Sequence, residues 1–189
     1  MTLQPDATPS SPAPEQDLCL NCGLCCNGVL FRDVELQAED NPARLGELGL
    51  PLKIRRTKPT KTAPATTIIS TPQPCRGLFG TRCTLYAERP LRCQQFDCAL
   101  LLEVRAGRTS TDQALRTIRT TRKAADKVQK LLAELGDTDT QTALSLRFQR
   151  TRKRLESTGG EDDDEAAIYA DLTLAVHDLQ HRLAKSFYP

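Results

Sequence analysis

The residues of this chain best suited to chemistry are its eight cysteines, which fall into two groups. The first group is the run Cys19-Leu-Asn-Cys22-Gly-Leu-Cys25-Cys26, and the second comprises Cys75, Cys83, Cys93 and Cys98. Thiolates bind zinc and iron–sulfur clusters, and three cysteines at intervals of three let one short segment offer several sulfurs to a metal. The spacing therefore predicts a metal centre in which all eight cysteines are ligands.

Two details of the first group refine this prediction. Adjacent side chains in extended backbone point in opposite directions, so Cys25 and Cys26 are expected to serve different metals, unless one of them is not a ligand. Gly23 stands where the loop must adopt positive φ or approach a metal closely.

Four thiolates around one divalent ion leave an excess of negative charge, which is costly in a partly buried site unless cations or N–H donors surround it. Four arginines interleave the second group of cysteines, namely Arg76, Arg82, Arg89 and Arg92. We expect their guanidinium groups to surround the thiolates.

Disulfides are the main alternative use of an even number of cysteines. The N-terminal segment from Met1 to Asp17 lacks the basic start and apolar run of a secretory signal, and no stretch approaches the roughly 20 apolar residues of a membrane span. The cytoplasm is the expected compartment and no membrane partner is expected. Cytosolic thiols are kept reduced, which favours metal ligation over disulfides.

The elements that position the cysteines are expected in three parts. Residues 1–17 are rich in proline and predict a flexible leader, residues 18–105 a cysteine-cluster metal-binding domain, and residues 106–189 a helical extension. Within the second part, we expect a strand over residues 28–36, a short helix from Pro42 to about Leu48, and a strand over residues 66–69.

The C-terminal part shows helical periodicity. Apolar residues recur at helical spacing between Asp112 and Leu135, and again after the acidic run of residues 161–165. A middle helix, capped by Thr138 or Asp139, carries Leu144, Phe148 and Leu155 on one face. The predicted fold class is α+β: a small, irregular cysteine-cluster domain with an α-helical C-terminal extension.

Other residues with possible chemistry are assigned to solvated surfaces. His177 and His181 are four residues apart but lie opposite the apolar stripe of the last helix. The helical part is rich in Lys and Arg, but no aromatic residues are interleaved for stacking on bases, and the net charge of the chain is only +2. A nucleic-acid partner is therefore not expected.

The complete cysteine pattern resembles the YkgJ-type cysteine-cluster family, described as a zinc- or iron-chelating domain. The resemblance spans about residues 18–102. The matching residues are the eight cysteines with Gly23, Tyr86, Arg89, Pro90 and Phe96. It implies metal chelation by the cysteines, with zinc or iron, including an iron–sulfur cluster, as the cofactor.

Three functions follow from these patterns. The leading hypothesis is a metal-binding protein whose metal is structural or serves redox or storage. The alternatives are an iron–sulfur-dependent oxidoreductase or methylase-like enzyme, and a metal-scaffolded adaptor for nucleic acid or protein. No catalytic residue is identified, since no substrate or S-adenosylmethionine signature is recognised, and family resemblance alone does not specify a reaction.

Overall fold

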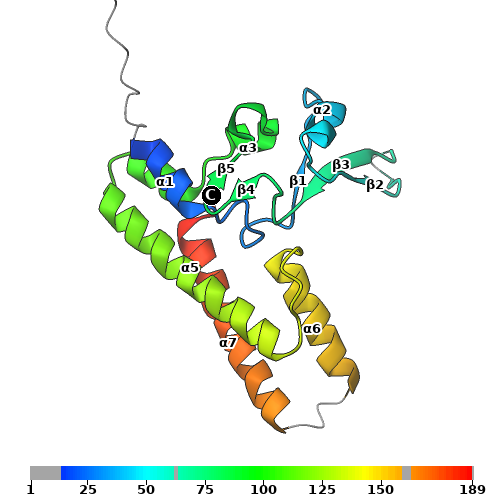
Figure 1. The fold of residues 1–189 in the computed structure, drawn as a ribbon, viewed down its shortest axis with the longest axis vertical. Coiled ribbons are helices and arrows are strands. Elements are labelled where there is room, and N and C mark those ends of the chain that lie inside the picture. Colours follow the sequence, from blue (N-terminus) through cyan, green and yellow to red (C-terminus); the bar gives the residue numbers. More distant parts are fainter. Residues whose placement is uncertain (1–13, 62–63, 159–162, 189) are drawn as a thin grey trace, which may run out of the picture.

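A computed structural model describes residues 14–61, 64–158 and 163–188 (Figure 1). Short helices and strands carry the cysteines, and long helices follow, so the fold is α+β as predicted. The elements of the first part are α1 (Pro14–Cys22), β1 (Asp33–Glu35), α2 (Pro42–Glu47), β2 (Lys53–Arg56), β3 (Thr67–Pro72), β4 (Leu78–Phe79), β5 (Arg82–Cys83), a 3-10 turn (Tyr86–Glu88), α3 (Leu91–Gln95) and α4 (Ala99–Arg105). The long helices are α5 (Thr111–Glu134), α6 (Leu144–Thr158) and α7 (Asp163–Ser186).

The strands form two small antiparallel sheets. The larger sheet has the order β1-β3-β2, with Val34 opposite Thr71 and Ile54 opposite Ile69. The predicted strand over residues 28–36 is shorter than expected and starts at Asp33. The preceding residues turn instead, because Leu30 donates its amide to the carbonyl of Leu24.

Helix α1 was not predicted from the sequence. It begins at Pro14, inside the segment predicted as a flexible leader, and residues 1–13 lie outside the described part of the chain. It ends at Cys22, so Cys19 and Cys22 lie on a helix rather than on a loop. Residues three apart share a helix face, so α1 directs both thiols to the same side.

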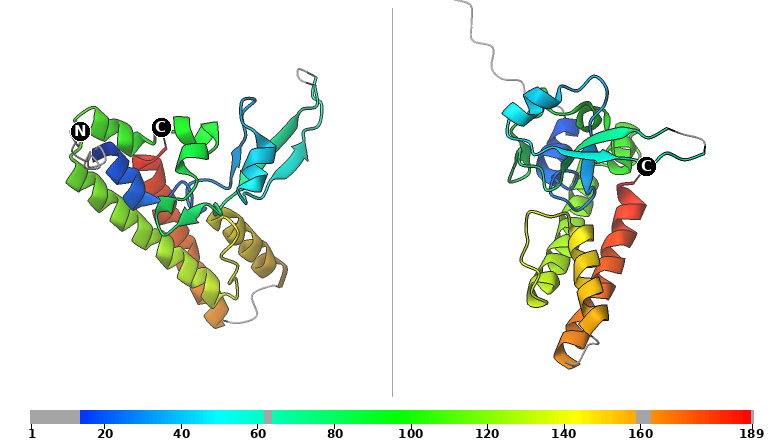
Figure 2. Two further views of the ribbon diagram at one scale, coloured as in Figure 1. Left: turned by 45° about the horizontal axis from the view of Figure 1, so that its top comes forward. Right: turned by 90° about the vertical axis from the view of Figure 1, so that its right-hand side faces the viewer.

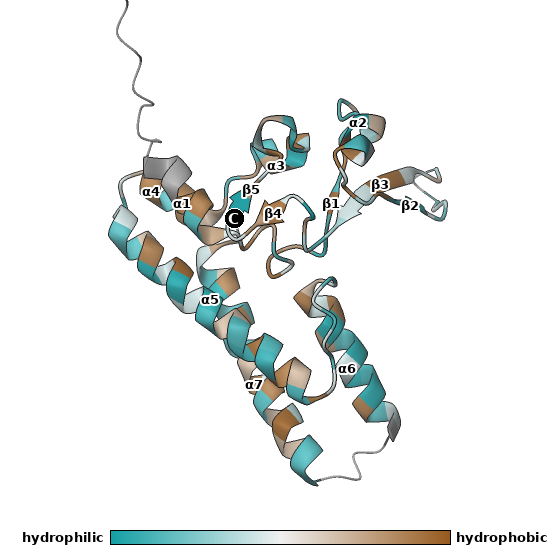
Figure 3. Ribbon diagram, in the orientation of Figure 1, coloured by the Kyte–Doolittle hydropathy of each residue, from teal (hydrophilic) through white to brown (hydrophobic). Residues whose placement is uncertain are grey.

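The long helices follow the predicted periodicity. Ser110 caps α5 by accepting a hydrogen bond from the Gln113 amide. Helices α5 and α7 lie side by side, and apolar and polar residues alternate along them as in helices with one buried face (Figures 1 and 3). Helix α6 begins at Leu144, later than a cap at Thr138 or Asp139 predicts.

One hydrophobic core joins the two parts of the molecule. It contains Leu18, Leu24 and Leu30 from the N-terminal cysteine segment, together with Leu172 from α7 and Phe187, which follows α7. Helix α1 packs against α4 and α5, and the C-terminal end of α7 reaches the cysteine region (Figure 2). The helices beyond residue 105 therefore support the cysteine segments directly. Among the described residues, no helix is long and apolar enough to cross a membrane.

Candidate metal centre

All eight cysteines line one cavity of about 750 Å³. Six elements or connections carry them: Cys19 and Cys22 on the last turn of α1, Cys25 and Cys26 in the turn that follows, Cys75 before β4, Cys83 at the end of β5, Cys93 in α3 and Cys98 at the start of α4. Segments about fifty residues apart in the sequence thus meet at one site, as the cysteine pattern predicts.

Backbone contacts hold the two cysteine segments together. The amide of Cys75 donates a 2.7 Å hydrogen bond to the carbonyl of Cys26, and the hydroxyl of Thr81 donates to the carbonyl of Leu20. Gly23 adopts the predicted positive φ, +69°, and a Cβ there would lie 3.4 Å from the Cα of Thr81. The turn between α1 and Cys25 is therefore pressed against the β4–β5 hairpin.

Four of the thiols form one electrostatic neighbourhood, which we call set A: Cys19, Cys22, Cys25 and Cys98. The pKa of Cys22 is raised to about 12, mainly by burial and to a smaller extent by negative charge on Cys98 and Cys19. Burial also raises the pKa of Cys25 well above its usual value, with contributions from Cys22, Cys26 and Cys98.

The other four thiols form set B: Cys26, Cys75, Cys83 and Cys93. Burial raises the pKa of Cys26 to about 12, with further contributions from Cys75, Cys93 and Cys83. Burial raises the pKa of Cys93 to about 11, again with Cys75 and Cys83 as neighbours. The adjacent residues Cys25 and Cys26 thus belong mainly to different sets.

The eight cysteines are free thiols in the structure. Within the described ranges, no three side chains of the types Cys, His, Asp and Glu are grouped closely enough to hold one metal ion as they stand. The backbone brings the cysteines around one cavity, but the sulfur atoms are not drawn together on one point.

Backbone N–H groups favour thiolates at some positions. Burial raises the pKa of Cys98, but the amides of Leu101 and Leu100, at the start of α4, oppose that rise. The Gly77 amide acts in the same way on Cys75. Such donors stabilise a negatively charged sulfur.

Arg89 lies between the two sets. Its guanidinium lies 4.0 Å from the centre of the Tyr86 ring, and its Nε atom is buried with no hydrogen-bond partner in the described part of the chain. Its positive charge acts to lower the pKa of Cys19 in set A and of Cys93 in set B, against the larger effect of burial. Of the four arginines expected around the thiolates, Arg89 and Arg92 line the cavity.

Two further arginines were missed by the sequence analysis. Arg122, on α5, donates to the carbonyls of Asn21 and Cys22 at 3.3 Å each, and its charge opposes the burial that raises the pKa of Cys22. Arg105 acts similarly on Cys19 and pairs with Asp97. No local signal marks Arg122, because it contacts the cysteine segment across about 100 residues of sequence.

Aromatic residues close part of the cavity. Phe96 packs edge-to-face on Phe31 with ring centres 4.9 Å apart, and both rings line the cavity. Phe187, which is 1% exposed, reaches the same cavity from the end of α7. Phe96 belongs to the sequence pattern that resembles the family, whereas the part played by Phe187 had no sequence signal.

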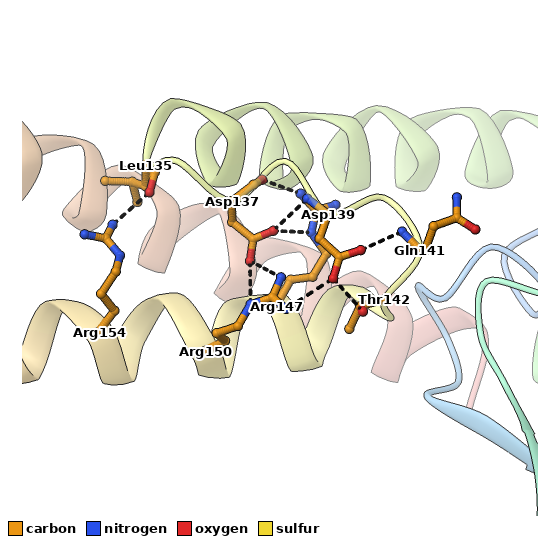
Figure 4. Close-up of polar contacts among 8 residues, drawn as sticks. All are labelled: Leu135, Asp137, Asp139, Gln141, Thr142, Arg147, Arg150 and Arg154. Atoms are coloured by element: carbon orange, nitrogen blue, oxygen red, sulfur yellow. Dashed lines mark hydrogen bonds and ion pairs between the residues drawn. The ribbon is translucent and has the colours of Figure 1, made fainter. Parts of the chain in front are cut away.

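The basic helices only partly follow the prediction of a solvated surface. Arg147 is 4% exposed and pairs with Asp137 at 3.0 Å, Arg150 binds both Asp137 and Asp139, and Arg154 donates to the Leu135 carbonyl (Figure 4). These residues hold the connection between α5 and α6. His177 and His181 are exposed, as expected.

A comparison with known families agrees with this site. The sequence model of the family "CxxCxxCC: Putative zinc- or iron-chelating domain" matches residues 18–118, more than half of the 189 residues. The chain belongs to this family. The match contains all eight cysteines, and it extends beyond the last cysteine into α5. No curated protein and no solved structure matches the chain.

Proposed function

We propose that this protein chelates zinc or iron in two all-cysteine sites, set A and set B. The supporting observation is that eight free thiols from distant segments line one cavity and divide electrostatically into two groups of four. Four cysteines are the usual complement for a structural zinc ion and for a [2Fe–2S] or [4Fe–4S] cluster. Cys25 and Cys26 then belong to different sites.

The electrostatics of the cavity support a positively charged occupant. Without a metal, burial and repulsion from neighbouring thiolates raise the pKa values of Cys22 and Cys26 to about 12, so these two thiols stay protonated well above neutral pH. A metal ion reverses this balance, because it binds the thiolate and displaces the proton. Arg89, Arg105 and Arg122 supply positive charge near the thiols, but three guanidinium groups are fewer than eight thiolates.

Binding requires the sulfurs of each set to converge. A cysteine side chain has a single heavy-atom torsion, so its sulfur can move to another staggered position without moving the backbone. The backbone hydrogen bond between Cys75 and Cys26 and the packing at Gly23 keep the segments in place while the sulfurs rotate.

The all-thiolate donor set favours a closed site over an open catalytic one. Structural zinc sites have four protein ligands, whereas catalytic zinc keeps a position for water or substrate. A bound iron–sulfur cluster would instead supply electron transfer. In either case the thiols must remain reduced, which supports the cytoplasm as the working compartment.

Elemental analysis with a visible spectrum tests this proposal on protein purified without oxygen. The expected result is zinc or iron bound by the chain. An absorption band near about 400 nm would identify an iron–sulfur centre, and colourless zinc-loaded protein would identify zinc. Metal-free protein that binds neither ion after reduction would refute the proposal.

The same protein sample distinguishes an iron–sulfur enzyme from a protein with a structural or storage role. An iron–sulfur enzyme requires a cluster that can be reduced and reoxidised, seen as reversible bleaching of the visible band with dithionite. Zinc-loaded protein without a redox-active chromophore would favour a structural or storage role.

A further inference from the structure

The β2–β3 hairpin concentrates positive charge away from the cysteine cavity. Residues 53–61 read Lys-Ile-Arg-Arg-Thr-Lys-Pro-Thr-Lys, with five basic residues and no acidic one. All five basic residues are exposed: Lys53, Arg55, Arg56, Lys58 and Lys61.

The hairpin projects from the body of the molecule (Figures 1 and 2). Strand β2 forms one edge of the sheet, and each of its four residues is exposed. Beyond the strands, Thr57 and Thr66 extend the ribbon through a 2.8 Å backbone hydrogen bond and a second bond to the Thr57 hydroxyl. Lys53, Arg55 and Arg56 therefore stand on a two-stranded ribbon, and Lys58 and Lys61 follow it in the sequence.

Among the described residues, most of this charge has no acidic partner. Arg55 lies 3.8 Å from Glu35, and in the described ranges no carboxylate lies within ion-pair distance of the other four basic side chains. Several basic residues of the helices differ in this respect, since Arg147, Arg150 and Arg182 are paired with aspartates.

We propose that the β2–β3 hairpin binds the phosphate backbone of duplex nucleic acid. A two-stranded ribbon fits the major groove of B-form DNA, about 12 Å wide, and exposed Lys and Arg side chains on both faces of β2 supply the phosphate contacts. The hairpin residues 53–61 include no aromatic residue, so stacking on single-stranded bases is not favoured.

An acidic protein is the competing partner. Protein–protein interfaces have cores depleted in lysine and enriched in aromatic residues, whereas interfaces with DNA are much more polar and positive. Ile54 is the one apolar side chain of β2, and it stands among basic neighbours. This composition favours nucleic acid, although the basic helices gave no reason to expect such a partner from the sequence.

Fluorescence anisotropy with a labelled mixed-sequence DNA duplex of about 20 base pairs tests the proposal on the full, metal-loaded chain. The hairpin variant is Lys53→Glu/Arg56→Glu/Lys58→Glu. The matched control, with the same change in charge on exposed positions of α5, is Arg116→Glu/Arg119→Glu/Lys123→Glu. Neutral replacements by Gln at the three hairpin positions serve as a second test, with circular dichroism and metal content confirming folding.

The expected result is salt-dependent binding by the wild type. Four phosphate contacts would weaken it by about 150-fold between about 50 and 200 mM salt. The hairpin variant should lose at least about tenfold in affinity and the Gln variant less, while the control stays within about twofold. The proposal fails if the wild type does not bind at about 20 mM salt, or if both charge-reversal variants lose affinity equally. Competition by polyglutamate as effective as that by unlabelled duplex at equal charge would also overturn it, in favour of an acidic protein.

Discussion

The cysteine cavity and the α5–α6 connection bury charge-bearing groups in opposite ways. At the connection, burial acts to raise the pKa of Asp137, but hydrogen bonds from Arg150 and Arg147 outweigh it and hold the pKa below its usual value. In the cavity, burial and neighbouring thiols raise the pKa values of Cys22, Cys26 and Cys93. Arginines therefore outweigh the effect of burial on Asp137 at the connection, whereas in the cavity the charges of Arg89, Arg105 and Arg122 are outweighed by the burial of the thiols.

Metal removal should have the largest effect. Structural zinc sites in small domains contribute about 10–16 kcal/mol of apparent binding free energy at neutral pH. A strong chelator, applied under reducing and oxygen-free conditions, is expected to lower the unfolding free energy by more than about 5 kcal/mol, or about 10–20 °C in the thermal midpoint. Adding the metal back should restore the midpoint, and a midpoint that never moves would contradict the comparison.

Removing the carboxylate that pairs with Arg147 and Arg150 should destabilise the fold strongly, whether or not metal is bound. Asp137→Ala leaves the 4% exposed Arg147 without its carboxylate, so we expect a loss of about 3–5 kcal/mol in chemical denaturation. Metal content should stay at the wild-type value.

Asp178→Ala is the matched control for that variant. It removes the exposed pair with Arg182 and should cost about 0.5 kcal/mol or less. Equal losses in the two variants would show that burial does not distinguish the pairs.

The pH dependence of stability should reverse with metal. In metal-free protein the folded pKa of Cys22 and Cys26, about 12, exceeds the unfolded value, so the folded state holds protons that the unfolded state releases. Stability from these thiols is present below about pH 9 and is lost as pH rises toward 12. In metal-loaded protein, protons compete with the metal, and stability should be lost in acid.

Thermal midpoints measured across pH, with and without metal, check this reversal. Parallel profiles for the two forms would mean that the metal does not bind these thiols.

Arg89 offers the smallest and most specific test. Its guanidinium acts on one thiol of each set, so Arg89→Gln should weaken metal binding by about tenfold to a hundredfold, as measured by competition with a chromophoric chelator. Arg76 is exposed, and Arg76→Gln should change affinity less than about twofold. If the two variants behave alike, Arg89 has no special electrostatic role.

Local patterns predicted much of the secondary structure. Asn41 before Pro42 placed α2 correctly, and the apolar period placed α5 and α7, because capping and amphipathicity are encoded within a few residues. Helix α1 was missed because its apolar residues form no stripe. Its stability comes instead from packing against α4 and α5.

In the candidate site, too, some residues are marked by a local sequence pattern and others are not. The cysteines and Arg89 stand in a recognisable spacing, and the adjacency of Cys25 and Cys26 predicts that they serve different metals, unless one of them is not a ligand. Arg122 and Phe187 could not be predicted as parts of the cavity, because only tertiary packing brings α5 and the end of α7 to it. Arg147 was assigned to a solvated face because its partner, Asp137, lies in a connection that has no regular pattern.

The most direct test of the two-site account is metal stoichiometry in two single variants, Cys22→Ser from set A and Cys93→Ser from set B. Elemental analysis of oxygen-free protein should find both sites filled in the wild type, and each variant should lose the metal of one site while keeping that of the other. Loss of all metal in both variants would indicate one shared centre, and full metal content in both would show that these sulfurs are not ligands.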